Sequence, residues 1–552
     1  MKRIIPLIIL LFSFQQLASA QFKILAESPA FEEPEEGFGR LLLLKNGNTV
    51  LIQIHREQKD GIEMRIYNKE HVETLKKHIK ARPGGDYATE SVNGIFEING
   101  DVAILITAII EKKPTLFRIV LNAATGDLKT MKKIAETGKH LIDEENPLFN
   151  PFLVRKDPLS DYYAVAISHD REEAPTDEQV EVMLYNGRHE EISRADYALS
   201  DNKYGLLQLH DLVVYNGETV GLLGYAYSYN DVLKRREGNL VLLKLEKNEH
   251  TLKLSMPDLM KGSQIDGGII RYNPVTGKLI LLGCALMDDD TEKETKKKVT
   301  PRPEIITEGN TEKKYIAFAA FANPATMSIE KVFDVFPAAA SERRKKLFKD
   351  KKAFSGMPQN LFLNADGGFS IVYEHLVTYI PVGSNIFLHT VHLGDIAVST
   401  FNREGIMQTS ALVPKEQRMY PSWLEPFYHS RRDNTGNPLL HGQQFKSFAY
   451  LNTGNKNYIL LNDTERNIDE LKSGSMITIM AVGACDAFYY PIDGRNTLPD
   501  RQYVFGNEKD KRTFKLAAFT ISDYDQANNI YVTMQVENGI RGKNTKVIWL
   551  QP

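Results

Sequence analysis

The residues best suited to make contacts with a ligand lie together in a stretch rich in aromatic and basic side chains, residues 418–433. Pro421 and Pro426 interrupt it, and proline is disfavoured inside a paired strand, so this stretch is predicted to be a loop. Loops that carry aromatic residues and arginine are typical of binding sites. The candidate binding residues are Tyr420, Trp423, Phe427, Tyr428, His429, Arg431 and Arg432. The alternative is that the aromatic residues anchor the loop to the protein body.

Motifs for covalent catalysis and nucleotide binding are missing from the sequence. We find no Gly-x-Ser-x-Gly turn, no Ser-x-x-Lys with its partner motifs, no glycine-rich phosphate loop and no dinucleotide fingerprint. A pair of catalytic carboxylates, as in glycosidases, stays open because the 71 acidic residues offer many combinations. The sequence therefore names no catalytic residue and favours a role other than catalysis.

Histidines gather in one region without a metal-binding pattern. Five of the 13 lie between residues 375 and 441, but no HExxH, HxH or DxDxDG motif occurs anywhere. His389 and His392 are three residues apart, so they point to opposite faces of a regular strand. Cys284 and Cys485 both lie in apolar surroundings and are either buried thiols or a disulfide. We expect no metal and no cofactor.

The N-terminus has the layout of a signal peptide. Lys2 and Arg3 precede an apolar run of about eleven residues, and 18–20 reads Ala-Ser-Ala, a pattern that signal peptidase accepts. Such a run is too short to span a bilayer, which takes roughly 20 residues. We predict that residues 1–20 are a signal peptide cleaved after Ala20 and that the protein is exported, either periplasmic or secreted. The alternatives are a buried N-terminal strand or an uncleaved anchor.

The overall composition excludes several classes of protein. The 42% hydrophobic and 25% charged residues are ordinary for a folded soluble chain. The formal charge of −3, from 68 basic and 71 acidic residues, argues against a nucleic-acid partner bound through bulk positive charge. No later run reaches 18 apolar residues, so no transmembrane segment is expected. The expected partner is an unknown protein or glycan.

The elements that must position these residues are predicted to be many short strands. Runs rich in Ile, Val, Leu, Phe and Tyr alternate with turns such as Asn46-Gly47 and Asn216-Gly217, which suit tight hairpins. The strands group in fours over seven segments, near 38–90, 94–137, 150–197, 205–257, 265–337, 358–415 and 443–540.

This grouping predicts an all-β fold, a β-propeller of about seven four-stranded blades. We expect residues 21–552 to form one such domain, in which strand 545–550 pairs with residues 22–26 to close the ring. The alternative is a row of tandem β-sandwich domains. The expected insertions lie near 288–314, 338–357, 416–442 and 465–512.

Two nearby stretches carry a resemblance to a known group of proteins. The first is Gly394–Gly405 with Pro414-Lys415, and the second is Ser447–Tyr450 with Tyr458–Asp463. They resemble a module of uncharacterised secreted bacterial β-propeller-like proteins, in which a strand-turn-strand ending in Pro-Lys precedes a strand ending in Asn-Asp. The resemblance covers roughly 70 residues and consists mostly of hairpin features. It implies export and a propeller-like fold, and it implies no activity and no site residue.

These observations lead to three hypotheses about function. The favoured one is an exported soluble β-propeller that acts as a binding or interaction scaffold. The first alternative is a glycan-active hydrolase or lyase that uses carboxylates at the propeller funnel. The second is a structural subunit of a cell-envelope complex. Acidic residues clustered with Arg or His at a funnel mouth would favour the enzyme, and a broad apolar patch would favour the scaffold.

Overall fold

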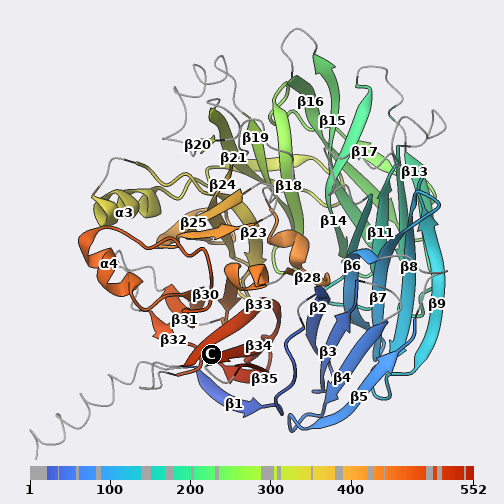
Figure 1. Cartoon of the computed structure of the whole chain (residues 1–552). Helices are drawn as coiled ribbons and strands as arrows, with labels where there is room; N and C mark the ends of the chain where they lie inside the picture. The colour runs from blue at the N-terminus through green and yellow to red at the C-terminus, as the bar shows by residue number, and fades with distance from the viewer. Residues whose placement is uncertain are drawn as a thin grey trace, which may run out of the picture.

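In the residues that the structure describes, the chain forms eight antiparallel β-sheets arranged as the blades of a propeller (Figure 1). The computed structural model describes residues 22–34, 36–56, 61–81, 89–138, 151–169, 179–197, 199, 204–230, 235–286, 304–306, 312–349, 352–379, 390–420, 427–440, 442–454, 456–492, 501–506, 513–539 and 542–552. The predicted all-β propeller is therefore confirmed.

The first four blades follow the chain order, each built as a meander of neighbouring strands. Blade 1 comprises β2 Glu36–Leu43, β3 Thr49–Ile54, β4 Ile62–Tyr67 and β5 Glu73–Ile79. Blade 2 comprises β6 Thr89–Ile98, β7 Asp101–Ile110, β8 Lys113–Asn122 and β9 Leu128–Glu136. Blade 3 comprises β10 Phe152–Lys156, β11 Tyr163–Ser168, β12 Val180–Tyr185 and β13 Glu191–Tyr197. Blade 4 comprises β14 Leu206–Tyr215, β15 Thr219–Asn230, β16 Arg235–Glu246 and β17 Lys253–Ser255.

Of the next three blades, blades 5 and 6 each carry one additional short strand. Blade 5 comprises β18 Gln264–Asn273, β19 Lys278–Leu286, β21 Glu312–Ala322 and β22 Ile329–Phe333, with β20 Glu304–Ile306 also paired to β21. Blade 6 comprises β23 Met357–Leu363, β24 Phe369–Tyr379, β25 Thr390–Phe401 and β26 Met407–Val413, with β27 Gln417–Met419 also paired to β25. Blade 7 comprises β29 Ala449–Asn452, β30 Asn457–Asp463, β31 Asp486–Ile492 and β32 Gln502–Tyr503.

Blade 8 joins the two ends of the chain. It contains β33 Thr513–Asp525, β34 Ile530–Gly539, β35 Gly542–Gln551 and the N-terminal strand β1 Lys23–Glu27. β1 pairs antiparallel with β35, Ile24 lying opposite Leu550, as the sequence predicted. The buried Trp549 indole donates to Thr49 Oγ1 at 2.9 Å and so ties blade 8 to blade 1. Closure of this kind leaves the ring without an open gap between its first and last blades.

The propeller has one blade more than the seven expected, and the difference arises in the last segment. The stretch 443–540 was predicted to supply a single sheet with an insertion at 465–512. In the structure, β31 and β32 lie inside that supposed insertion and complete blade 7. The long connection from β30 to β31 holds helix α4 Asn467–Ser473, which separates paired strands in sequence. Residues 513–551 therefore do not belong to blade 7, and they form blade 8 together with β1.

The other insertions are short or lie partly outside the described residues. The 338–357 segment contains helix α3 Ala338–Phe348, and of 288–314 only 304–306 and 312–314 are described. Neither α3 nor α4 is long and apolar enough to cross a membrane, and no other described helix is.

The core lies between facing blades, where the apolar sides of neighbouring sheets meet. Between blades 5 and 6, for example, the rings of Phe369 and Phe401 stack at 4.9 Å beside Phe321. Cys284 and Cys485 are both buried free thiols in different core clusters. Burial raises the pKa of both thiols, to about 12 for Cys485. The question that the sequence left open is thus resolved against a disulfide.

Candidate functional site

Part of the predicted binding loop lies on the propeller axis, and we call residues 427–440 the axial segment. Its strand β28, Asn437–Leu440, pairs with β2 on the side away from β3, inside the ring. Its backbone also joins blade 2, because Ile95 N donates to the carbonyl of Asn434 at 2.6 Å and Gly436 N donates to that of Val92 at 3.2 Å. In Figure 1, β28 lies close to the centre of the ring. The axial segment therefore enters the channel instead of lying over its mouth.

Side chains from blades 1, 3 and 6 also hold the axial segment. Arg155 of β10 donates to the carbonyl oxygens of Asp433, at 3.3 Å, and Ser430, at 3.2 Å. Arg40 of β2 donates to the carbonyl of Arg432 at 3.3 Å. Asn360 of β23 donates to the Asp433 carboxylate at 3.0 Å. Backbone carbonyls that turn away from any sheet need such donors when they lie inside a protein.

A buried aspartate connects the arginines of the channel. Asp211 of β14 accepts from Arg155 at 3.1 Å and from Arg271 of β18 at 2.6 Å, while Arg271 also reaches Asp433 at 3.5 Å. Burial opposes ionisation of Asp211, but the two guanidinium groups outweigh it and hold the pKa of this carboxyl below its usual range. Asp211 therefore stays charged and fixes the arginines of two blades.

A second buried charge group lies at the start of the axial segment. The Glu374 carboxylate of β24 accepts from the Lys415 ammonium and from the Tyr428 hydroxyl, and neither Glu374 nor Lys415 is more than 1% exposed. Burial raises the pKa of Tyr428 and lowers that of Lys415. The Arg432 guanidinium lies 4.7 Å from the centre of the Tyr428 ring. These contacts make Tyr428 an anchor of the loop.

His429 contacts both polar and aromatic groups. Its Nδ1 lies 3.3 Å from the Asn360 amide nitrogen, and its ring stacks on Phe448 with centroids 4.7 Å apart. Burial lowers the pKa of His429 to about 4, so the imidazole is neutral at pH 7. Because neutral imidazole has one acceptor and one donor nitrogen, His429 can accept from Asn360 through Nδ1.

The predicted binding residues divide between buried and exposed positions. Phe427 and Tyr428 are buried, and His429 and Arg432 are half-buried within the network on the axis. Tyr420 is 41% exposed and Arg431 is exposed. Trp423 lies outside the described residues. The structure thus brings Tyr428, His429 and Arg432 together and leaves Tyr420 and Arg431 at the surface.

Sequence reasoning missed the partners that the other blades supply, namely Arg155, Asp211, Arg271 and Asn360. They come from four different strands, and nothing in their spacing indicates that they meet. A weak signal exists, since Asp211 is a charged residue inside the largely apolar strand β14, and Arg271 follows the buried Ile269 and Ile270 in β18. Charged residues are rarely buried unless they are paired.

The histidine-rich region forms no metal centre among the residues that the structure describes. The rings of His375 and His392 lie 6.1 Å apart, and His392 Nε2 lies 2.5 Å from Glu416. Thr478 also donates to Glu416, at 3.1 Å. Within the described ranges, no group of three or more His, Cys, Asp or Glu residues is placed to hold a metal ion. His389 and His441 lie outside those ranges.

Comparisons with known proteins identify no family. No family model matches the sequence, and no curated protein matches it significantly. Among solved structures, the polysaccharide lyase Uly1 superposes with a TM-score of 0.37 at 11% identity over 83% of this chain and 89% of its own. A eukaryotic initiation factor gives 0.37 at 10% identity over 96% and 93%. The α-L-arabinofuranosidase Arb93A from Fusarium graminearum gives 0.33 at 12% identity over 70% and 98%. Similarities this weak carry no activity over to this chain.

Proposed function

We propose that this protein is an exported propeller that serves as a binding or interaction scaffold, with the loop that leads onto its axis as the contact element. The observation that supports a scaffold is that the chain itself occupies the channel. The axial segment occupies it, and hydrogen bonds and ion pairs from several blades hold that segment in place. Tyr420 precedes this anchored segment and Arg431 lies within it; both side chains are exposed, and both are residue types that dominate binding surfaces.

The carboxylates of the channel are engaged by cations, which disfavours acid–base catalysis there. Asp211 is shared by two arginines, Glu374 pairs with Lys415, and Asp523 of β33 lies 3.9 Å from Arg40. A glycosidase needs one carboxyl that holds a proton and a second that is ionised about 5–10 Å away. At Asp211 the two guanidinium groups hold the pKa below its usual range and so work against a protonated form, whereas burial raises the pKa of Asp523.

The scaffold proposal is tested with purified residues 21–552. Bait protein is cross-linked in the cell envelope of the organism that makes it, and each recovered partner is then titrated against the bait by calorimetry. We expect Tyr420→Ala and Arg431→Ala each to weaken binding about tenfold, the loss typical of a contact residue. Matched controls are Tyr229→Ala and Arg403→Ala, which alter exposed side chains on other surfaces. Equal losses in the control variants would contradict the assignment of this loop.

A glycan-cleaving enzyme is the second candidate, and Asp433 is the observation that favours it. This carboxylate is 38% exposed, lies on the axis and contacts both Arg271 and Asn360 near His429. Incubation with a panel of polysaccharides, followed by assays for new reducing ends and unsaturated products, tests this function. Cleavage that disappears in Asp433→Asn would replace the scaffold proposal with the enzyme.

The proposed export has its own test. The sequence predicts that the mature protein begins at Gln21, and N-terminal sequencing of protein recovered from outside the cytoplasm checks this directly. A mature protein that retains Lys2 and Arg3 would contradict a cleaved signal peptide.

A further inference from the structure

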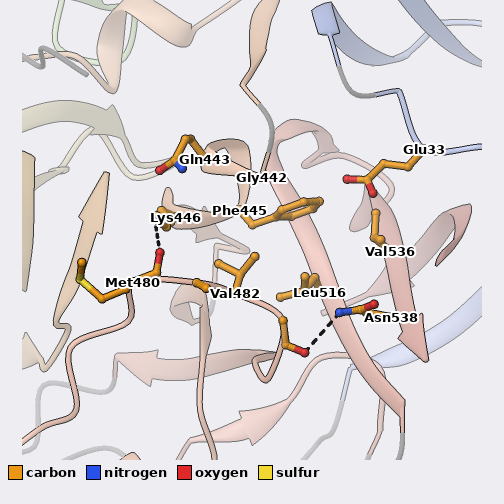
Figure 2. Close-up of a pocket in the computed structure, with 12 residues that line it drawn as sticks. Glu33, Gly442, Gln443, Phe445, Lys446, Met480, Val482, Leu516, Val536 and Asn538 are labelled. Atoms are coloured by element: carbon orange, nitrogen blue, oxygen red, sulfur yellow. Dashed lines mark hydrogen bonds between the residues drawn. The ribbon is translucent and has the colours of Figure 1, made fainter. Parts of the chain in front are cut away.

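A cavity of about 280 Å³ lies beside the point where the chain leaves the axis. Figure 2 shows it between the short helix η4 Gln443–Lys446, the loop at 480–483 and strands β33 and β34 of blade 8. Its volume is near the small end of ligand pockets, which span about 300–1,000 Å³. The residues around it are Glu33, Gly442, Gln443, Phe445, Lys446, Met480, Ala481, Val482, Gly483, Leu516, Val536 and Asn538.

Lys446 contributes a buried positive charge to this cavity. The residue is 2% exposed, and its ammonium donates to the backbone carbonyls of Arg418 and of Met480, the latter at 2.8 Å. Within the part of the chain that the structure describes, Lys446 forms no ion pair with a carboxylate, and the nearby titratable group that favours its charge is the Cys485 thiol. Burial lowers the pKa of Lys446 to about 8. A buried cation with only neutral acceptors is costly, and an anion beside it would relieve that cost.

The remaining walls of the cavity suit an apolar molecule. Phe445, Leu516 and Val536 are buried apolar residues, and Val482 packs against the same core cluster. Met480, 46% exposed, adds an apolar group to the lining. The Asn538 amide is engaged, since it donates to the Gly483 carbonyl at 3.3 Å. In Figure 2, Glu33 lies on the side of the cavity away from Lys446.

We propose that this cavity binds a small monocarboxylate with an apolar body, the carboxylate beside the Lys446 ammonium and the body against Phe445, Val482, Leu516 and Val536. An ammonium has three donor hydrogens, and the two carbonyl contacts leave one for the ligand. Glu33 sets a specificity, because a second carboxylate on the ligand would meet a like charge on that side. The cavity lies beside the proposed contact loop, because Gln443 accepts from Tyr420 N at 3.3 Å and Lys446 donates to the Arg418 carbonyl, but ligand binding here does not depend on the scaffold function.

Octanoate is the probe, with octanamide and octanedioate as matched comparisons, each titrated into the full mature chain by calorimetry at pH 7. We expect octanoate to bind at least tenfold more tightly than either comparison ligand. Lys446→Met should remove the preference for octanoate over octanamide. Lys472→Met is the control, because Lys472 is an exposed lysine on α4 that pairs with Asp469, and it should leave the preference intact.

Two further measurements separate ligand binding from a purely structural role of Lys446, whose loss could loosen the loops at 418 and 480. Val482→Trp fills the cavity and keeps Lys446, and it should weaken octanoate at least tenfold without changing the melting temperature. Octanoate should also raise the pH at which the Lys446 side chain titrates, followed by NMR of ¹³C-labelled lysine. Equal binding of octanoate and octanamide, or unchanged binding in Val482→Trp, would overturn the proposal. Binding of scaffold partners is scored separately in the same variants.

Discussion

The buried group formed by Glu374, Lys415 and Tyr428 offers the sharpest test of how the axial segment is held. Lys415→Met keeps the length and apolar stem of the side chain but removes the one cation that the structure, in its described residues, places at ion-pair distance from Glu374. The carboxylate is fully buried, so it cannot recover the lost interaction from water. The variant therefore leaves a buried carboxylate without its ion-pair partner, with Arg432 as a remaining nearby cation.

The size of the effect follows from this burial. Removing one partner of a buried ion pair costs about 3–5 kcal/mol of folding free energy. We expect about 3 kcal/mol for Lys415→Met, the low end, because the Tyr428 hydroxyl still donates to Glu374. Glu374→Gln should cost a similar amount by leaving Lys415 unpaired. The double variant removes both charges and should lose only about 1–2 kcal/mol, which gives a coupling energy of several kcal/mol.

Urea denaturation followed by tryptophan fluorescence measures these changes, because Trp549 is fully buried and becomes exposed on unfolding. Lys472→Met is the matched control, since its partner Asp469 is on the surface and we expect no measurable change. A loss below about 1 kcal/mol in Lys415→Met would refute the reasoning. Additive losses in the two single variants would refute it as well, because independent sites show no coupling.

The remaining predictions address the channel, the ring closure and the core. Asp211→Asn leaves Arg155 and Arg271 without their shared carboxylate and should destabilise the protein by about 3–5 kcal/mol in chemical denaturation. Burial, with Arg431 and Arg236 nearby, lowers the pKa of His210 to about 3, below the ordinary value near 6.5. The unfolded chain therefore binds a proton first as the pH falls from 6.5, and the stability contributed by neutral His210 declines by about 1.4 kcal/mol per pH unit until the pH reaches the folded-state pKa. His210→Asn should flatten the pH dependence of the urea midpoint between pH 6 and 4, and an unchanged slope would contradict the assignment. Removal of residues 22–27 deletes β1 and the stacking of Phe22 on Tyr489, so the melting temperature should fall, whereas removal of residues 1–20 should not lower it. A thiol reagent should modify neither Cys284 nor Cys485 in the native protein and both after unfolding, and rapid native labelling would show that one of them is accessible.

The stretch 418–433 shows what residue types alone can predict about a binding site. Its aromatic and arginine content indicated contacts, and the sequence left open whether these were with a ligand or with the protein body. The structure assigns internal contacts to Phe427 and Tyr428 and surface positions to Tyr420 and Arg431. The same local chemistry serves both purposes, because aromatic rings and guanidinium groups bind a protein interior and a partner surface by the same interactions.

The sequence by itself determined the all-β class, the first six blades and the pairing of the two chain ends. It did so because the period-two alternation of a strand and the demands of its turns are local properties. Only the tertiary structure decided that there are eight blades, since the strands of blade 7 are separated by α4 and blade 8 is completed from the opposite end of the chain. It also decided that Arg155, Asp211, Arg271 and Asp433 meet on the axis. Whether these four residues come into contact depends on the number of sheets in the ring and on which strand of each sheet lies innermost. No local sequence pattern specifies the number of sheets or the innermost strand.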